Sequence, residues 1–143
     1  MNAINWFFWA FLSAVFAALT AVFAKIGIQG VDSDFATLLR TAIIIILLSV
    51  FVCLSGKWTN PFLLSSKTWI FLGLSGLATG ASWVCYFRAL QIGDASKVAP
   101  VDKFSLVLVT IFAFMFLGER PTLQEWAGIA MVAGGVLTLA FKH

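Results

Sequence analysis

Five apolar segments follow one another along this chain, and only short polar connections separate them. A helix needs about 20 mostly apolar residues to cross a bilayer, and it satisfies its backbone polar groups within the segment itself. With 62% hydrophobic and 10% charged residues, the chain has too few polar side chains to cover a soluble fold. We therefore predict an all-α membrane protein. Its five transmembrane helices should lie at about residues 6–24, 35–54, 68–90, 98–118 and 122–141.

No linker or low-complexity stretch divides the sequence, so we predict one domain over residues 1–143. It should cross the cell membrane several times (the inner membrane in a Gram-negative bacterium). The net charge of +3 is small and scattered, which argues against a nucleic-acid partner. Cys53 and Cys85 lie within apolar segments, and His143 is the last residue, so we expect no metal and no cofactor. The sequence offers no acid–base pair or activated nucleophile, so we do not expect an enzyme.

A polar cluster, SKVAPVDKFS, stands where the fourth apolar segment begins. In one interpretation Pro100 starts that helix, Asp102 lies in its first turn near the positive end of the helix dipole, and Lys103 extends outward to the interface. In the other, the cluster lies at or just below the interface, where ionisable side chains tend to pair or to face a cavity. A polar gate could then form from four residues at the same end of the helices. They are Arg40, Arg88, Asp94 and Asp102.

Small residues recur at helical spacing in two of the segments. Gly73, Gly76 and Gly80 form one face of the third, and Ala130 and Gly134 lie four residues apart in the fifth. Small side chains let helix backbones approach closely in a membrane. We therefore predict that both faces pack against other helices, within the chain or between subunits.

Hydroxyl groups form a second face of the third segment. Ser75, Thr79, Ser82 and Tyr86 follow one another at steps of three or four, and Trp83 lies beside them, deeper than an interfacial tryptophan should be. Each hydroxyl could bond the backbone of its own helix. Alternatively, the line faces a cavity and offers hydrogen bonds to a substrate.

The second half of the chain resembles a known repeat. YFRALQIGDASKVAPVDKFS, followed by FLGERPTLQEWAGIAMVAGGV, is similar to the EamA-type repeat of the drug/metabolite transporter superfamily. The shared pattern is an aromatic and Ala-Leu ending the third helix, a proline near the start of the fourth, Leu-Gly-Glu closing it, and a glycine-rich fifth helix. Arg40 near the start of the second helix also fits.

Most members of that family carry two such repeats of opposite orientation, whereas this chain resembles the five-helix, single-repeat subgroup. The resemblance implies a secondary carrier with its first four helices around a central pathway. Transporters built from inverted repeats bind substrate where two repeats meet, so one repeat needs a second copy. We expect a dimer in the lipid bilayer, most simply a homodimer, and an antiparallel assembly would reproduce the two-repeat geometry. It would move a small-molecule substrate by alternating access.

Residues near that pathway are the candidates for substrate binding. They are Arg40, Thr79, Ser82, Trp83, Tyr86 and Pro100. Asp102, Lys103 and Arg88 are candidates for a gate or for ion coupling; Asp102 is the nearest coupling acid, because the first apolar segment has none. The related four-helix small multidrug resistance proteins carry a glutamate there. The alternative is a non-transporting membrane subunit that packs beside a partner complex through the small-residue faces.

Overall fold

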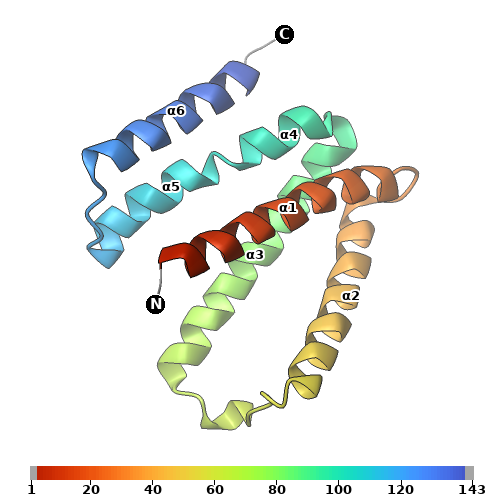
Figure 1. Cartoon of the computed structure of the whole chain (residues 1–143). Coiled ribbons are helices and arrows are strands. Elements are labelled where there is room, and N and C mark those ends of the chain that lie inside the picture. Colours follow the sequence, from red (N-terminus) through yellow and green to blue (C-terminus); the bar gives the residue numbers. More distant parts are fainter. Residues whose placement is uncertain (1–2, 141–143) are drawn as a thin grey trace. The chain divides into compact units, whose positions relative to one another are not determined.

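The computed structural model describes the backbone of residues 3–140 and the side chains of residues 6–140, and these residues form helices and no strand (Figure 1). In chain order the elements are α1 (Ala3–Gly27), α2 (Ser33–Leu54), the 3-10 turn η1 (Pro61–Leu63), α3 (Ser66–Ile92), α4 (Ala95–Asp102), α5 (Ser105–Phe112), the π-helical turn η2 (Ala113–Leu117) and α6 (Leu123–Ala140).

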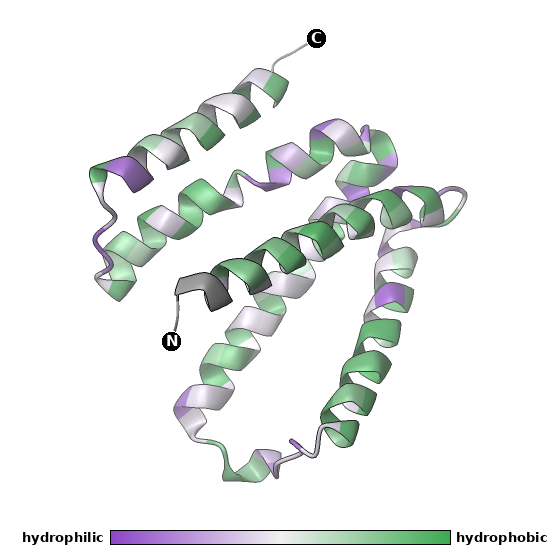
Figure 2. Ribbon diagram, viewed as in Figure 1, coloured by the Kyte–Doolittle hydropathy of each residue, from purple (hydrophilic) through white to green (hydrophobic). Residues whose placement is uncertain are grey.

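Five stretches of these helices are long and apolar enough to cross a membrane. They are Trp6–Gly27, Ser33–Leu54, Ser66–Ile92, Ala95–Leu117 and Leu123–Ala140. Hydrophobic residues run along them, and hydrophilic ones gather mostly at their ends and in the connections (Figure 2). The predicted fold class is confirmed, with the described helices extending past most of the predicted limits. Residue 141 of the predicted last helix lies outside the described residues.

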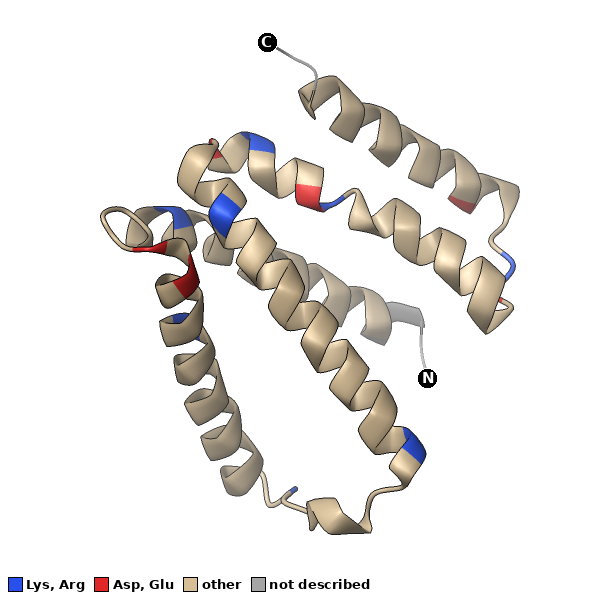
Figure 3. Ribbon diagram, turned by 180° about the vertical axis from the view of Figure 1, so that it is seen from behind, with Lys and Arg blue, Asp and Glu red and all other residues tan. Residues whose placement is uncertain are grey.

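The chain divides into two compact units. The α2–α3 unit covers residues 23–92, and α2 and α3 pack against each other in it. They are closest where α2 begins and α3 ends and diverge toward η1 (Figures 1 and 3). The buried side chains of this unit lie at the close end. They are Ile28, Ser33, Thr37, Phe87 and Leu90.

The α4–α6 unit comprises the described parts of residues 1–22 and 93–143. In it α6 packs against α4 and α5, and Ala113 and Val136 are buried. Thr122 and Glu125 start α6 with reciprocal bonds: the Thr122 N–H donates to Glu125 Oε2 at 2.6 Å, and the Glu125 N–H donates to Thr122 Oγ1 at 3.3 Å. This pair is a capping box, which satisfies backbone N–H groups that have no partner inside the helix.

The fourth span differs from its prediction. Its helix begins at Ala95, so Pro100 lies inside α4 and does not start it. Asp102 is the last residue of α4, not part of a first turn, so the predicted contact with a positive helix end is wrong. The N–H groups of Lys103 and Phe104 donate to carbonyls three residues back, at 3.0 and 2.9 Å, and α5 begins only at Ser105. Hydropathy alone missed this break, because both halves are apolar enough for one span.

Candidate substrate site

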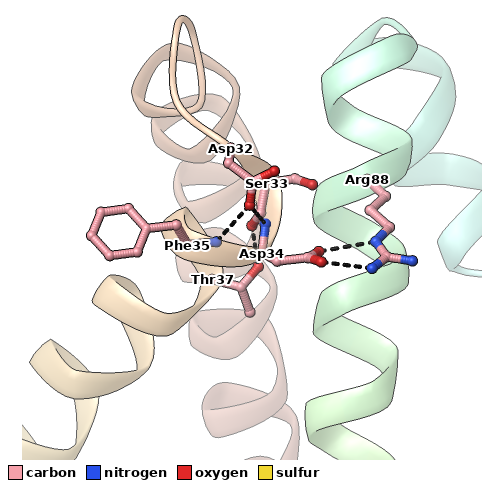
Figure 4. Close-up of polar contacts among 6 residues, drawn as sticks. All are labelled: Asp32, Ser33, Asp34, Phe35, Thr37 and Arg88. Atoms are coloured by element: carbon pink, nitrogen blue, oxygen red, sulfur yellow. Dashed lines mark hydrogen bonds and ion pairs between the residues drawn. The ribbon is translucent and has the colours of Figure 1, made fainter.

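The start of α2 is fixed by side chains of its own first turns. Asp32 Oδ1 accepts hydrogen bonds from the N–H groups of Asp34 and Phe35, both at 3.0 Å, and so caps the helix (Figure 4). One turn on, the Thr37 hydroxyl donates to the Ser33 carbonyl at 2.8 Å, and both residues are buried. The cap leaves the Asp34 carboxylate free to turn toward the neighbouring helix α3.

Arg88 of α3 meets that carboxylate. Its Nε donates to Asp34 Oδ1 at 2.9 Å and its Nη2 to Asp34 Oδ2 at 2.6 Å, a two-point ion pair (Figure 4). Two further bonds tie the segment before α2 to the end of α3: Lys25 Nζ donates to the Leu90 carbonyl at 2.6 Å, and Gln91 Nε2 to the Val31 carbonyl at 3.1 Å. Most charged residues of this unit gather at this end (Figure 3). This set of bonds holds α2 and α3 in register.

Arg40 occupies a different environment, farther along α2. Its guanidinium carbon lies 4.5 Å from the centroid of the Trp83 ring and 5.4 Å from that of Phe87. Trp83 and Phe87 are four residues apart on α3, so their rings lie on one face of the helix. Cation–π attraction stabilises such an arrangement. Among the residues that the structure describes, Arg40 has no hydrogen bond and no ion pair.

The sequence left two interpretations of the hydroxyl line on α3: bonds to its own helix backbone, or a face directed at a cavity. The Thr79 hydroxyl donates to the Ser75 carbonyl of its own helix at 2.8 Å, which is the backbone alternative. Ser82 is exposed. Tyr86 is half-buried, and its ring centroid lies 6.4 Å from that of Phe87. The structure thus brings Trp83 and Arg40 together and places Tyr86 beside Phe87, whereas the Thr79 hydroxyl is bonded to its own backbone.

The predicted gate residues fall in both units. Arg88 belongs to the α2–α3 unit, where Asp34 holds it. Asp102 and Lys103 belong to the α4–α6 unit, and there Lys103 Nζ lies 3.4 Å from Asp102 Oδ2. Pro100, predicted as a substrate contact, lies in this unit too. Asp94, in the same unit, lies 3.5 Å from Lys97. A gate made of residues from both units stays a prediction.

The predicted packing faces are uncovered in the described part of the chain. A Cβ built on Gly73, Gly76, Gly80 or Gly134 meets no heavy atom within 4 Å, and Ala130 is exposed. Along α3 the reason is the divergence of α2 toward η1 (Figures 1 and 3). Contact of these faces with another subunit therefore stays a prediction.

Two features of this region escaped the sequence analysis. The ion pair of Asp34 with Arg88 joins residues 54 positions apart, and the Lys25 bond to Leu90 spans 65. A signal for the first was present: an acid in the first turn of one span and a base near the end of the next can meet if the spans are antiparallel neighbours. Within the described residues, no group of three His, Cys, Asp or Glu side chains could hold a metal ion.

Comparison with known proteins gives three findings. A family model described as "EamA-like transporter family" matches residues 4–141. A Sinorhizobium protein named "Uncharacterized transporter in cobO 3'region" is 56% identical over 136 residues, which are 95% of this chain and 96% of that protein. Yersinia pestis and Yersinia pseudotuberculosis proteins named "Probable 4-amino-4-deoxy-L-arabinose-phosphoundecaprenol flippase subunit ArnE" are 33% identical over 70 residues, 49% of this chain and 61% of theirs. No solved structure matches the chain significantly.

Proposed function

The chain belongs to the EamA-like transporter family, and from this membership we propose that it is a carrier that moves a small molecule across the cell membrane by alternating access as a dimer. It is a multi-pass membrane protein, and its described residues include five helices long and apolar enough to span the bilayer. Its family and the names of its relatives point to a transporter rather than an enzyme. In a Gram-negative bacterium the membrane would be the inner one.

One observation carries the proposal: an arginine of one span contacts an aromatic ring of the next span, far from the ends of both helices. Arg40 lies seven residues after the first residue of α2, which is about 10 Å along a helix axis. Its contact Trp83 lies nine residues before the last residue of α3, about 13 Å from that end. Ionisable side chains at such depth are costly, and they mark the paths of substrates or ions through membrane proteins.

The proposed dimer rests on the repeat that this chain carries. The Sinorhizobium relative aligns along 96% of its own length, so that protein holds one repeat of this size. Carriers with inverted repeats form their site between two repeats, so a second copy would supply the other wall. The glycine face of α3 (Gly73, Gly76 and Gly80) is uncovered in the described chain and suits close contact between helices. We propose a homodimer, and the topology test below decides whether its two copies insert in opposite directions.

Export from liposomes tests the carrier. The purified protein is reconstituted into liposomes loaded with a metabolite extract, and mass spectrometry identifies the solutes that leave. We expect at least one solute to leave these liposomes faster than it leaves loaded liposomes that lack the protein. Trp83→Ala should slow that solute by about tenfold or more, since the lost cation–π contact and aromatic wall are worth about 1.4 kcal/mol or more.

Trp69→Ala is the matched control. Trp69 lies on the same helix near its start, where its Nε1 donates to the Pro61 carbonyl at 3.1 Å, outside the proposed site. It should keep the wild-type rate while both variants insert equally well. A protein that releases no solute at all, or a Trp83→Ala variant as fast as Trp69→Ala, would contradict the proposal.

The second candidate is a membrane subunit of a larger assembly, and the Yersinia relatives favour it because they are named flippase subunits. Topology separates the two candidates. A cytoplasm-active and an exterior-active reporter are fused separately to the C-terminus. Activity of both reporters supports an antiparallel homodimer, since the copies must then insert both ways. Activity of one alone, with release of solutes only when a second membrane protein is added, supports the subunit.

A further inference from the structure

The Arg40 guanidinium lies against two aromatic rings and not against a carboxylate. Trp83 and Phe87 lie 4.5 and 5.4 Å away, measured from ring centroid to guanidinium carbon. A guanidinium carries its five N–H donors in its plane, around the edge. In the described part of the chain none of those donors has an acceptor. The side chain is therefore anchored without using its hydrogen-bonding capacity.

From this arrangement we propose that Arg40 binds a phosphate or carboxylate group of the carrier's ligand, so that the ligand is an oxyanion. The inference rests on the proposed function, because it names the substrate class of that same site. A guanidinium fork matches a phosphate or carboxylate with two parallel hydrogen bonds, an arrangement that a lysine cannot form.

The charges around Arg40 support an anionic ligand. Two acids lie near the start of α2, and both already have hydrogen-bond partners. Asp32 accepts two backbone N–H groups as the helix cap, and Asp34 accepts hydrogen bonds from Nε and Nη2 of Arg88. Neither bonds Arg40. A cation inside a span without a counter-ion is costly, so a ligand that supplies the negative charge gains that free energy on binding.

The aromatic pair also prepares the site. Phe87 is buried at 3% exposure and Trp83 is half-buried, so the surface under Arg40 is packed in place on α3. A long arginine side chain fixed before binding loses less rotamer freedom when the ligand arrives. The apolar rings also exclude water, which strengthens the hydrogen bonds to the anion.

Binding in uncharged dodecylmaltoside micelles, in buffer without phosphate, tests the proposal. The soluble probes are butyl phosphate and butyrate, with butanol as the uncharged match. The lipid probes are phosphatidic acid and, as its match without phosphate, diacylglycerol, both added to mixed micelles. Wild type should bind the charged probes, and Arg40→Gln should bind them about tenfold to a hundredfold more weakly, the usual value of hydrogen bonds to a charged group.

Lys67→Gln is the matched control, because it removes one positive charge at the opposite end of α3. It should leave the dissociation constants within about twofold of the wild type, because exposed charges are screened over such a distance. Arg40-dependent binding of butyl phosphate or butyrate supports a soluble oxyanion. Arg40-dependent binding of phosphatidic acid alone supports a lipid headgroup. Equal affinity for butanol, or equal loss in Arg40→Gln and Lys67→Gln, would overturn the proposal.

A second readout covers the case in which Arg40→Gln fails to fold. Butyl phosphate or phosphatidic acid should change the tryptophan fluorescence of the wild type, because the anion would bind beside the indole of Trp83. Trp83→Phe keeps an aromatic ring under Arg40 and should abolish most of that change, whereas Trp69→Phe should preserve it. Equal changes in both variants would overturn the proposal.

Failure of the anion site and failure of the carrier give different results. If the protein releases an uncharged or cationic solute, and Arg40→Gln does not change the rate of that release, the anion site is overturned and the carrier function is supported. Arg40-dependent anion binding by a protein that releases no solute would support the anion site and count against the carrier.

Discussion

Two arginines of the α2–α3 unit, Arg88 and Arg40, are positive charges inside membrane-spanning helices, and different contacts stabilise them. Arg88 lies near the end of α3, and its side chain, 62% exposed, gives two N–H donors to the Asp34 carboxylate. Arg40 lies farther from the helix ends and is half-buried, and two aromatic rings contact it where Arg88 has a carboxylate. Both cations therefore lie within spans and are stabilised by α2–α3 contacts.

The difference decides what each can still do. An ion pair uses the edge of the guanidinium, which is the part that recognises anions. A contact with aromatic rings needs no oxygen acceptor, so the N–H donors of the guanidinium stay available for a ligand. Arg88 therefore stabilises the contact between two helices, whereas Arg40 keeps the donors that a ligand needs. Sequence position does not separate these roles, because each is one arginine in an otherwise apolar helix.

The largest expected effect comes from removing the packing on which both arginines depend. Leu90 is fully buried beside Phe87 at the close end of α2 and α3. Leu90→Ala should lower the free energy of unfolding by about 2–5 kcal/mol, the range for a cavity left by a buried leucine. The measurement is unfolding by sodium dodecyl sulfate from dodecylmaltoside micelles, followed by circular dichroism. Ile92→Ala, at a side chain 91% exposed, should change it by less than about 0.5 kcal/mol. Equal losses would show that α2 and α3 do not pack as described.

An intermediate effect is expected for the contact of Arg40 with Trp83. Arg40→Met and Trp83→Leu, alone and together, form a double-mutant cycle read from the same unfolding measurement. The coupling free energy should be about 0.5–2 kcal/mol, because removing either partner already removes the cation–π attraction. A second cycle pairs Arg40→Met with Trp69→Leu, near the other end of α3, and should give no coupling free energy. A coupling of zero in the first cycle would mean that the aromatic rings do not hold Arg40.

The sequence was sufficient for the spans, because hydropathy along a chain reports burial in lipid directly. The first helix was predicted at 6–24 and runs over Ala3–Gly27, and the third, predicted at 68–90, is Ser66–Ile92. The helices continue past the apolar residues because polar side chains at the interface do not end a helix whose backbone groups are still bonded. The resemblance to the EamA-type repeat, seen mainly in residues 86–105 and 116–136, is confirmed by the family match over residues 4–141.

The site was only partly predictable. Arg40 and Trp83 could each be predicted as site residues, because a charge and a deep tryptophan are unusual in apolar helices. The contact between them could not be predicted, because it depends on the register of α2 against α3 across the connection at residues 55–65. The break between α4 and α5 was missed for a similar reason: hydropathy averages over both halves, whereas the break is a change of partner for two N–H groups, those of Lys103 and Phe104.

The smallest effect should come from the exposed ion pair, and salt should separate it from the aromatic contact. In a cycle of Asp34→Asn with Arg88→Gln, we expect a favourable coupling at low ionic strength that shrinks as salt is added, since exposed charges are screened. The coupling of Arg40 with Trp83 should change less over the same range, because the rings partly shield it from solvent.

Exchanging the two charges, Asp34→Arg with Arg88→Asp, shows how far the pair depends on its place. The exchange restores an ion pair between the same two positions, so the double variant should be more stable than either single one. It should still be less stable than the wild type. Asp34 lies in the first turn of α2 and Arg88 in the last turns of α3, where an acid and a base respectively suit the helix dipoles. A double variant as unstable as the sum of its parts would mean that Arg88, like Arg40, is held by something other than Asp34, and the contrast between the two arginines would fall.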